Sequence, residues 1–238
     1  DTIDPVKLAP LLYFRGDTGI TTDGGNVSEW TQVTGTGMGS ALSRSLANGS
    51  AAYQPKHDTS DNHLTFEVDG TDASLTFDVA VTQAGILIVA TSNGIFAYEV
   101  DADSIDAITA LGFETGYFFA LDLYAYLLLP AATTDSDVVN AIAYLDSQTG
   151  ATKNPTGSLY QYWRSRTDLV APKFSGIDFG GVTNFSVCWA YCTSLTEFPK
   201  IDTSSGTDFS SCWESCSSLS EFPKIDLSSG TNFYGCWY

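Results

Sequence analysis

The five cysteines are the residues whose type and spacing first suggest chemistry, because thiolates bind metals and form disulfides. All lie within the last 51 residues, at Cys188, Cys192, Cys212, Cys216 and Cys236. Zinc sites favour the CxxC spacing with a second pair or histidines nearby. Here the paired cysteines stand four residues apart, and the only two histidines lie in segment 57–63. An odd cysteine count also argues against a disulfide framework, so we expect reduced thiols buried in a narrow core.

Three aspartates, Asp178, Asp202 and Asp226, recur every 24 residues, each at the start of a turn. Calcium could bridge such a row, but aspartate at a turn more often accepts a hydrogen bond from a nearby backbone N–H, and we favour the turn. Segments 57–63 (HDTSDNH) and 101–106 (DADSID) lack the mid-loop glycine of an EF-hand. We expect polar loops there, with a lectin-like Ca²⁺ site as the alternative; no other cofactor is expected.

Motifs of catalysis are not found in the sequence: it contains no GxSxG, P-loop or zinc-protease pattern. Carboxylate pairs are uninformative in so acidic a chain, and two histidines in one polar loop do not make a triad. Arg15-Gly16-Asp17 matches an integrin-binding tripeptide, but three residues match easily by chance, and we give it no role. We therefore expect no enzymatic activity.

The formal charge of −18 limits the possible partners. Nucleic acid and anionic membrane surfaces are bound through clustered Lys and Arg, so we expect neither as a partner. The longest apolar run, Leu121–Leu129, is too short to cross a bilayer and contains Asp122. Free thiols fit a chain that is made and assembled in a cytoplasm.

The elements that would position these residues begin with a β-rich region, residues 1–150. Alternating apolar residues in 64–79 predict a hairpin, and the continuous apolar run Gly85–Thr91 predicts a strand buried on both faces. Segments 95–100 and 121–126 alternate again. Strands at such spacing predict an antiparallel, jelly-roll-like β-sandwich, so the expected fold class is mainly β.

One helix is expected after these strands. Thr134 or Asp135 would cap its start, and Gly150 would end it. Its buried face would carry Val138, Ile142 and Leu145.

Residues 173–238 repeat themselves with a period of 24. Segments Leu195–Trp213 and Leu219–Trp237 are identical at 14 of 19 positions, and Phe185, Cys188 and Trp189 mark a degenerate earlier copy. The period lies within the range of leucine-rich repeats. We expect an extended LTEFPKID piece and a compact piece in each coil, stacked about 4.8 Å apart into a short, incomplete solenoid. Because solenoids need caps, we expect further repeats beyond Tyr238 or another subunit over this end.

Charged residues recur on the extended piece of each repeat, at Glu197, Lys200, Glu221 and Lys224. Stacking would place them in rows, and solenoids commonly bind ligands through such regular faces. The alternative is that the rows only keep this face soluble. The sequence leaves both interpretations open.

Residues 151–172 join the two regions and hold a cluster of basic and aromatic residues, including Trp163, Arg164 and Arg166. One interpretation is a docking surface for an acidic partner. The other, which we favour, is that Trp163 and its neighbours cap the first coil, as solenoid ends require.

Two resemblances follow from these segments. DGGNVSEWTQVTG and LTFEVDGTDASLTF, followed by AYLLLPAATTDSDVVNAIAYLDSQTGA, resemble the concanavalin-like (laminin-G-type) jelly rolls of phage and bacterial surface proteins. The repeats resemble BspA-like (bacterial-surface-protein type) leucine-rich repeats. Trp189, Cys192, Ser194 and Leu195 match the pattern of that family, in which a core aromatic is followed by cysteine and then Ser-Leu. Pro199 departs from its simplest form.

The resemblances imply a non-catalytic phage virion surface protein, a tail-fibre or receptor-binding component that binds a host-surface glycan or protein. They imply other virion subunits as partners, a homo-oligomer, and assembly in the host cytoplasm. The alternative is a structural capsid-decoration or fibre subunit acting in assembly. A bacterial surface adhesin is the third candidate.

Overall fold

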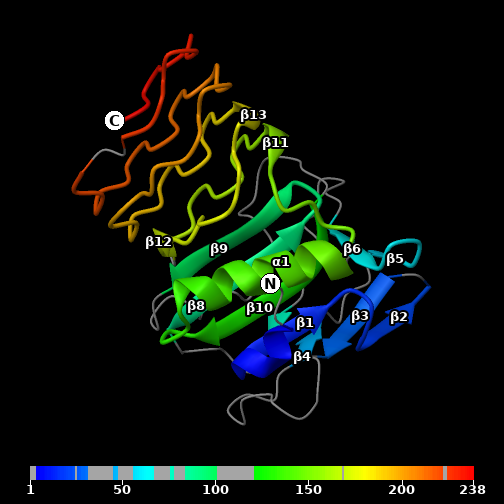
Figure 1. The fold of residues 1–238 in the computed structure, drawn as a ribbon. Helices are drawn as coiled ribbons and strands as arrows, with labels where there is room; N and C mark the ends of the chain where they lie inside the picture. Colours follow the sequence, from blue (N-terminus) through cyan, green and yellow to red (C-terminus); the bar gives the residue numbers. More distant parts are fainter. Residues whose placement is uncertain are drawn as a thin grey trace.

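The structure is a computed structural model of residues 1–238. It describes residues 4–24, 26–31, 45–47, 56–66, 76–77, 84–100, 121–167, 169–221 and 224–238. Within these ranges the fold is mainly β with one α-helix (Figure 1). The described elements are η1 (Pro5–Leu8), β1 (Leu12–Arg15), β2 (Ile20–Asp23), β3 (Asn26–Thr31), β4 (Ser45–Ala47), β5 (Lys56–Asp58), β6 (His63–Phe66), β7 (Thr76–Phe77), β8 (Gly85–Thr91), β9 (Gly94–Val100), β10 (Leu121–Pro130), α1 (Asp135–Gln148), β11 (Thr156–Ser158), β12 (Leu169–Pro172) and β13 (Gly181–Asn184).

The strands before α1, together with β12 after it, form one antiparallel network, in the order β12-β9-β8-β10-β6-β5-β3-β4-β7, with β1 paired to β10 and β2 to β3. Strand β10 is its centre, since β8 pairs along one edge while β1 and β6 share the other. The expected hairpin at 64–79 is not formed by the described residues, because β6 is already paired on both sides, by β5 and β10, while β7 pairs with β4. The turn of that hairpin and segment 101–106 lie outside the described residues.

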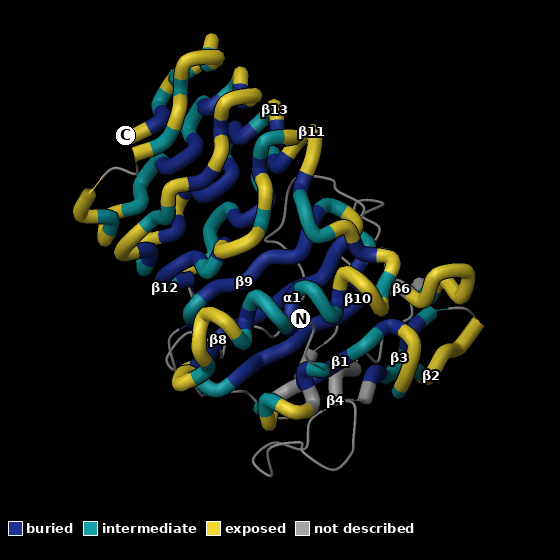
Figure 2. Tube along the Cα trace, viewed as in Figure 1, coloured by how far each residue is buried: buried dark blue, intermediate teal, exposed yellow. Residues whose placement is uncertain are grey.

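The prediction that Gly85–Thr91 is buried on both faces is confirmed, since every residue of β8 is buried (Figure 2). Alternate side chains of a strand point to opposite faces. Ile86 and Ile88 belong to the cluster that α1 covers, whereas Leu87 and Val89 belong to the cluster on the other face. A continuous apolar run is needed here because both faces of the strand are covered.

Helix α1 is confirmed with small shifts at its ends. Thr134 is the N-cap, and its hydroxyl accepts a hydrogen bond from the backbone N–H of Asp137 at 3.2 Å. The helix ends at Gln148, two residues before Gly150, whose hydrogen faces the Tyr124 ring. A Cβ at Gly150 would lie 2.5 Å from that ring. The residues buried against the sheet are Val138, Ala141, Ile142 and Leu145.

The opposite face of the sheet is covered by residues that follow α1. Phe96 and Tyr98 of β9 contact Trp163, with ring centroids 5.2 and 4.7 Å away, and Tyr98 also contacts Phe174. The indole N–H of Trp189 donates to the Tyr98 hydroxyl at 3.0 Å, with both side chains fully buried. One hydrophobic cluster therefore runs from the sheet into the repeats.

Candidate functional site

The repeats form a stack of four coils beside the sheet (Figure 1). We define their hydrogen-bonded parts as coil 1 (157–166), coil 2 (183–192), coil 3 (207–216) and coil 4 (231–238). Equivalent residues lie 26 positions apart between coils 1 and 2, and 24 positions apart thereafter. In each pair of neighbouring coils, the earlier coil donates four backbone hydrogen bonds to the later one, with N···O distances of 2.6 to 3.1 Å. Thr207 and Thr231 also donate N–H groups back to the carbonyls of Thr183 and Thr207, each at 2.8 Å.

Coil 1 is a repeat that the sequence analysis did not recognise as one. Leu159 and Trp163 occupy the positions of Phe185 and Trp189, and the N–H of Trp163 donates to the carbonyl of Cys188 at 2.8 Å. Trp163 is buried, so it packs beneath the stack rather than on a docking surface. This burial agrees with the favoured interpretation, a cap on the repeats, and leaves only Arg164 and Arg166 of the alternative docking surface partly exposed. The Trp-to-Trp spacing of 26 was the signal that could have revealed it.

Most of the backbone hydrogen bonds between coils run in one direction. In coil 2, Phe185, Val187, Trp189 and Tyr191 donate N–H groups to carbonyls of coil 3, and their equivalents in coils 1 and 3 do the same. The N–H groups of the intervening Cys188 and Ala190 close turns within the coil, onto the carbonyls of Phe185 and Val187. Each coil therefore turns most of its N–H donors toward the following coil. The exceptions include Thr207 and Thr231, whose N–H groups donate back to the preceding coil.

Left-handed backbone makes this arrangement possible. Val187 and Tyr191 have φ of 58° and 62°, and the equivalent Ser211 and Ser215 have φ of 51° and 57°. Non-glycine residues rarely adopt such angles. In coil 4 the equivalent position is Gly235, which tolerates it freely. The inter-coil hydrogen bonds and the buried rings offset the strain in coils 2 and 3.

The ladder lies in the compact piece of each repeat, not in the extended piece where it was expected. Residues 195–202 contain no strand. Within this segment the backbone N–H of Thr196 donates to the carbonyl of Val170 in β12 at 3.0 Å. Pro199 lacks an N–H, which explains why this side carries no regular ladder.

Equivalent rings stack inside the coils. Phe185 lies 5.2 Å from Phe209 at an interplanar angle of 6°, and Phe209 lies 5.6 Å from Phe233 at 3°. Trp189 and Trp213 are likewise stacked, 5.7 Å apart. Burying a column of large aromatic rings supplies much of the stability that few short repeats need.

The cysteines line the same core, and none of the five forms a disulfide. The thiols of Cys192 and Cys216 donate to the carbonyls of Trp163 and Trp189, each at 3.0 Å. Burial raises the pKa of Cys216 to about 11. The Cys216 thiol therefore stays protonated at neutral pH, and both thiols act as small core residues and hydrogen-bond donors.

The repeated aspartates begin turns. Asp178, Asp202 and Asp226 each accept a hydrogen bond from the backbone N–H two residues on, at 2.8 to 2.9 Å. Hydrogen bonds from Ser228, and then the charge of Lys200, hold the pKa of Asp226 below its usual value. This is the turn chemistry that the sequence analysis favoured. Within the described ranges, no three His, Cys, Asp or Glu side chains gather into a group that could hold a metal ion.

The four charged residues expected on a binding face, Glu197, Lys200, Glu221 and Lys224, are all exposed. They lie on the irregular segments that link successive ladder pieces, so they follow the repeat but not a sheet. Lys200 faces the next repeat, because its charge influences Asp226.

A second group lies along the edge of the stack. The guanidinium carbon of Arg164 lies 5.6 Å from the ring centre of Tyr191, whose hydroxyl donates to Glu214 at 2.6 Å. Arg166 lies over the ring of Trp163, at 5.9 Å. These contacts link coils 1, 2 and 3 in one partly exposed strip of basic, aromatic and acidic groups. Tyr191 and Glu214 were not singled out from the sequence, because nothing in it relates them to Arg164.

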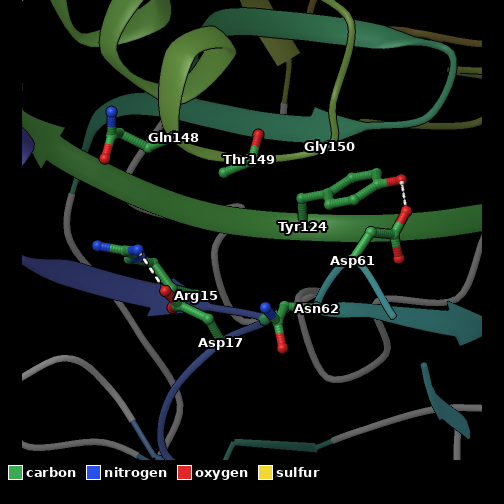
Figure 3. A pocket seen from close by; sticks show the side chains of 9 residues that line it. Arg15, Asp17, Asp61, Asn62, Tyr124, Gln148, Thr149 and Gly150 are labelled. Atoms are coloured by element: carbon green, nitrogen blue, oxygen red, sulfur yellow. Dashed lines mark hydrogen bonds and ion pairs between the residues drawn. The ribbon is translucent and has the colours of Figure 1, made fainter. Parts of the chain in front are cut away.

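A small polar cavity of about 60 Å³ lies at the end of α1 (Figure 3). Its lining is Arg15, Gly16, Asp17, Asp61, Asn62, Tyr124, Gln148, Thr149 and Gly150. The Arg15 guanidinium pairs with Asp17, and the Tyr124 hydroxyl donates to Asp61 at 2.9 Å. The tripeptide at 15–17 therefore folds back on itself, and the cavity has room for a few water molecules.

No helix in the described part of the chain is long and apolar enough to span a bilayer. Comparison with protein families, with curated proteins and with solved structures finds no match for this chain.

Proposed function

We propose that this chain is a non-catalytic binding protein of a virion surface, a tail-fibre or receptor-binding component. In this proposal the coils are a short solenoid of the BspA-like leucine-rich-repeat type, carried by a concanavalin-like, jelly-roll-related module. The ligand is a host-surface glycan or protein, bound along the exposed side of the coils. The resemblances of the sequence support this assignment, because a fold alone does not determine function.

The observation that carries the proposal is the recurrence of exposed polar groups on a rigid stack. Glu197 and Lys200 return 24 residues later as Glu221 and Lys224, and all four are exposed. A stack presents such groups at a regular spacing, which suits a ligand that is itself repetitive, such as a polysaccharide. The aromatic strip around Tyr191 adds a face on which a sugar ring can pack.

The test is binding of the labelled chain to bacterial cells and to purified envelope polysaccharides. We expect the double variant Lys200→Ala/Lys224→Ala to lose at least about tenfold in affinity, or about 1.4 kcal/mol. Lys7→Ala removes an exposed lysine on η1 and is the matched control. Equal binding by both variants would contradict the assignment of this face.

A structural role in assembly is the second candidate, favoured by the apolar face of coil 4. Tyr234, Trp237 and Tyr238 are among the few large apolar side chains that the described residues expose. Immunogold labelling on particles, with the copy number of the chain, separates the two roles. A copy number equal to that of the major capsid protein would favour the structural subunit.

A further inference from the structure

Tyr191 is an aromatic residue at a position where the neighbouring coils carry serine. Its equivalents are Ser165 in coil 1 and Ser215 in coil 3, and the backbone of all three is left-handed, with φ of 62° at Tyr191, 61° at Ser165 and 57° at Ser215. A bulky residue rarely adopts such angles. Strained residues of this kind cluster at functional sites. The geometry of the coil explains the left-handed backbone here, but it does not explain the aromatic ring.

The Tyr191 side chain reaches the surface and is held there by two other coils. It is 37% exposed, whereas Trp189 of the same coil is fully buried. The guanidinium carbon of Arg164 in coil 1 lies 5.6 Å from the ring centre, and the hydroxyl donates to Glu214 in coil 3 at 2.6 Å. These contacts fix the ring in one orientation, so a ligand that packs on it loses little binding energy to ordering the side chain.

A purely structural role for these contacts leaves the ring unexplained. Four backbone hydrogen bonds already run from each coil to the next, and contacts between exposed charged and polar groups add little to stability. The serines of coils 1 and 3 show that the stack forms without a ring at this position.

The three side chains provide the groups that bind a sugar. The C–H groups of a pyranose pack on an aromatic ring, while its hydroxyls donate to carboxylates and accept from guanidinium groups. Hydrogen bonds from Tyr191 and then Ser211 hold the pKa of Glu214 below its usual value, so its carboxylate is charged at neutral pH. A carboxylate has about four acceptor sites, so Glu214 can also accept from a ligand. The charges of Arg164 and Glu214 balance, which favours a neutral ligand over an ion.

We propose that Arg164, Tyr191 and Glu214 form a subsite for one hexose ring of a neutral polysaccharide. The hexose packs on the exposed surface of Tyr191, donates hydroxyl groups to Glu214 and accepts hydrogen bonds from Arg164. The formal charge of −18 disfavours an acidic polymer, because like charges repel. The inference rests on the proposed function and names the ligand class. The subsite belongs to the ladder pieces, not to the segments that carry Lys200 and Lys224, so the two faces can be tested separately.

The test measures the affinity of the full chain for dextran, mannan and galactan by electrophoresis in gels that contain each polymer, with dextran sulfate as the acidic comparison. Tyr191→Ser introduces the residue that coils 1 and 3 carry at this left-handed position, so the stack should be retained. Tyr234→Ser is the matched control. It changes an exposed tyrosine at a different position of the repeat, where coil 3 carries Ser210.

We expect the full chain to bind at least one of the neutral polymers and Tyr191→Ser to lose at least about tenfold in affinity, with less than about a twofold change in the control. Hydroxyl-radical footprinting of the unmodified chain gives a readout that does not depend on a variant. Saturating polymer should lower the oxidation of Tyr191 and leave that of Tyr234 unchanged.

Equal binding by Tyr191→Ser and the control, or unchanged oxidation of Tyr191, would overturn the subsite and leave the receptor-binding proposal standing. Binding to dextran sulfate alone would also overturn it. A chain that binds bacterial cells but none of the neutral polymers would overturn this inference only. A chain that binds neither cells nor any polysaccharide would overturn the proposed function as well.

Discussion

Tyr98→Phe removes one hydroxyl from the contact between the sheet and the coils. The hydroxyl accepts the indole N–H of Trp189 at 3.0 Å, and neither side chain has any exposed surface. The phenyl ring keeps its packing against Trp163 and Phe174, so the change leaves a buried donor without an acceptor. Such a donor costs about 1–3 kcal/mol. We expect the free energy of unfolding to fall by about that amount.

The assay is urea denaturation, followed by tryptophan fluorescence and by far-UV circular dichroism. Tyr234→Phe, at a position that is 84% exposed, is the control and should change stability by less than about 0.5 kcal/mol. Because one cluster spans sheet and coils, the two signals should change at the same urea concentration. A Tyr98 variant as stable as the control, or two separate transitions in the unmodified chain, would refute this account of the interface.

Three further changes probe other parts of the structure. Trp213→Ala removes a nearly buried ring stacked on Trp189 and should cost about 3–5 kcal/mol; a ligand-binding loss with unchanged thermal stability would assign this residue to a site instead. Thr134→Ala removes the N-cap of α1 and should lower the free energy of unfolding by about 1 kcal/mol, measured by urea denaturation. Thr133→Ala is not a suitable control, because the Thr133 hydroxyl also donates to a backbone carbonyl. Burial raises the pKa of Cys216 from 9.0 to about 11, so the unfolded chain loses its proton first and the free energy of unfolding falls as pH rises through that window. Cys216→Ser should reduce this slope, and an unchanged slope would contradict the burial.

Strand β8 and helix α1 could be predicted from sequence because their patterns depend on local chemistry and burial. A run without polar residues, such as 85–90, has no stable place except between two covered faces. The caps at Thr134 and near Gly150 likewise act within one turn of the helix. The pairing of segment 64–79 could not be predicted this way, because β6 pairs with the central strand β10, which lies far along the chain.

In the candidate site, too, some features could be predicted from the sequence and others could not. The period of 24 and the exposed positions of Glu197 and Lys200 were readable from the sequence. Coil 1 was not recognised in the sequence. Leu159 and Trp163 occupy the same positions as in the other coils, but the neighbouring residues and the spacing to the next coil differ from those of the repeat. Shape and backbone hydrogen bonding define the coil, and neither leaves a strong mark on residue identity.

By itself, the sequence determined that the chain contains repeats, that its cysteines lie in one core, and that one strand is buried on both faces. These properties follow from the identity and spacing of neighbouring residues. The tertiary structure alone decided that the coils cover the sheet, that Trp163 is buried, and that most backbone hydrogen bonds between coils run in one direction. The physical reason is that the direction of an N–H depends on φ, and residues such as Val187 and Ser211 reach left-handed values only because neighbouring coils hold them there.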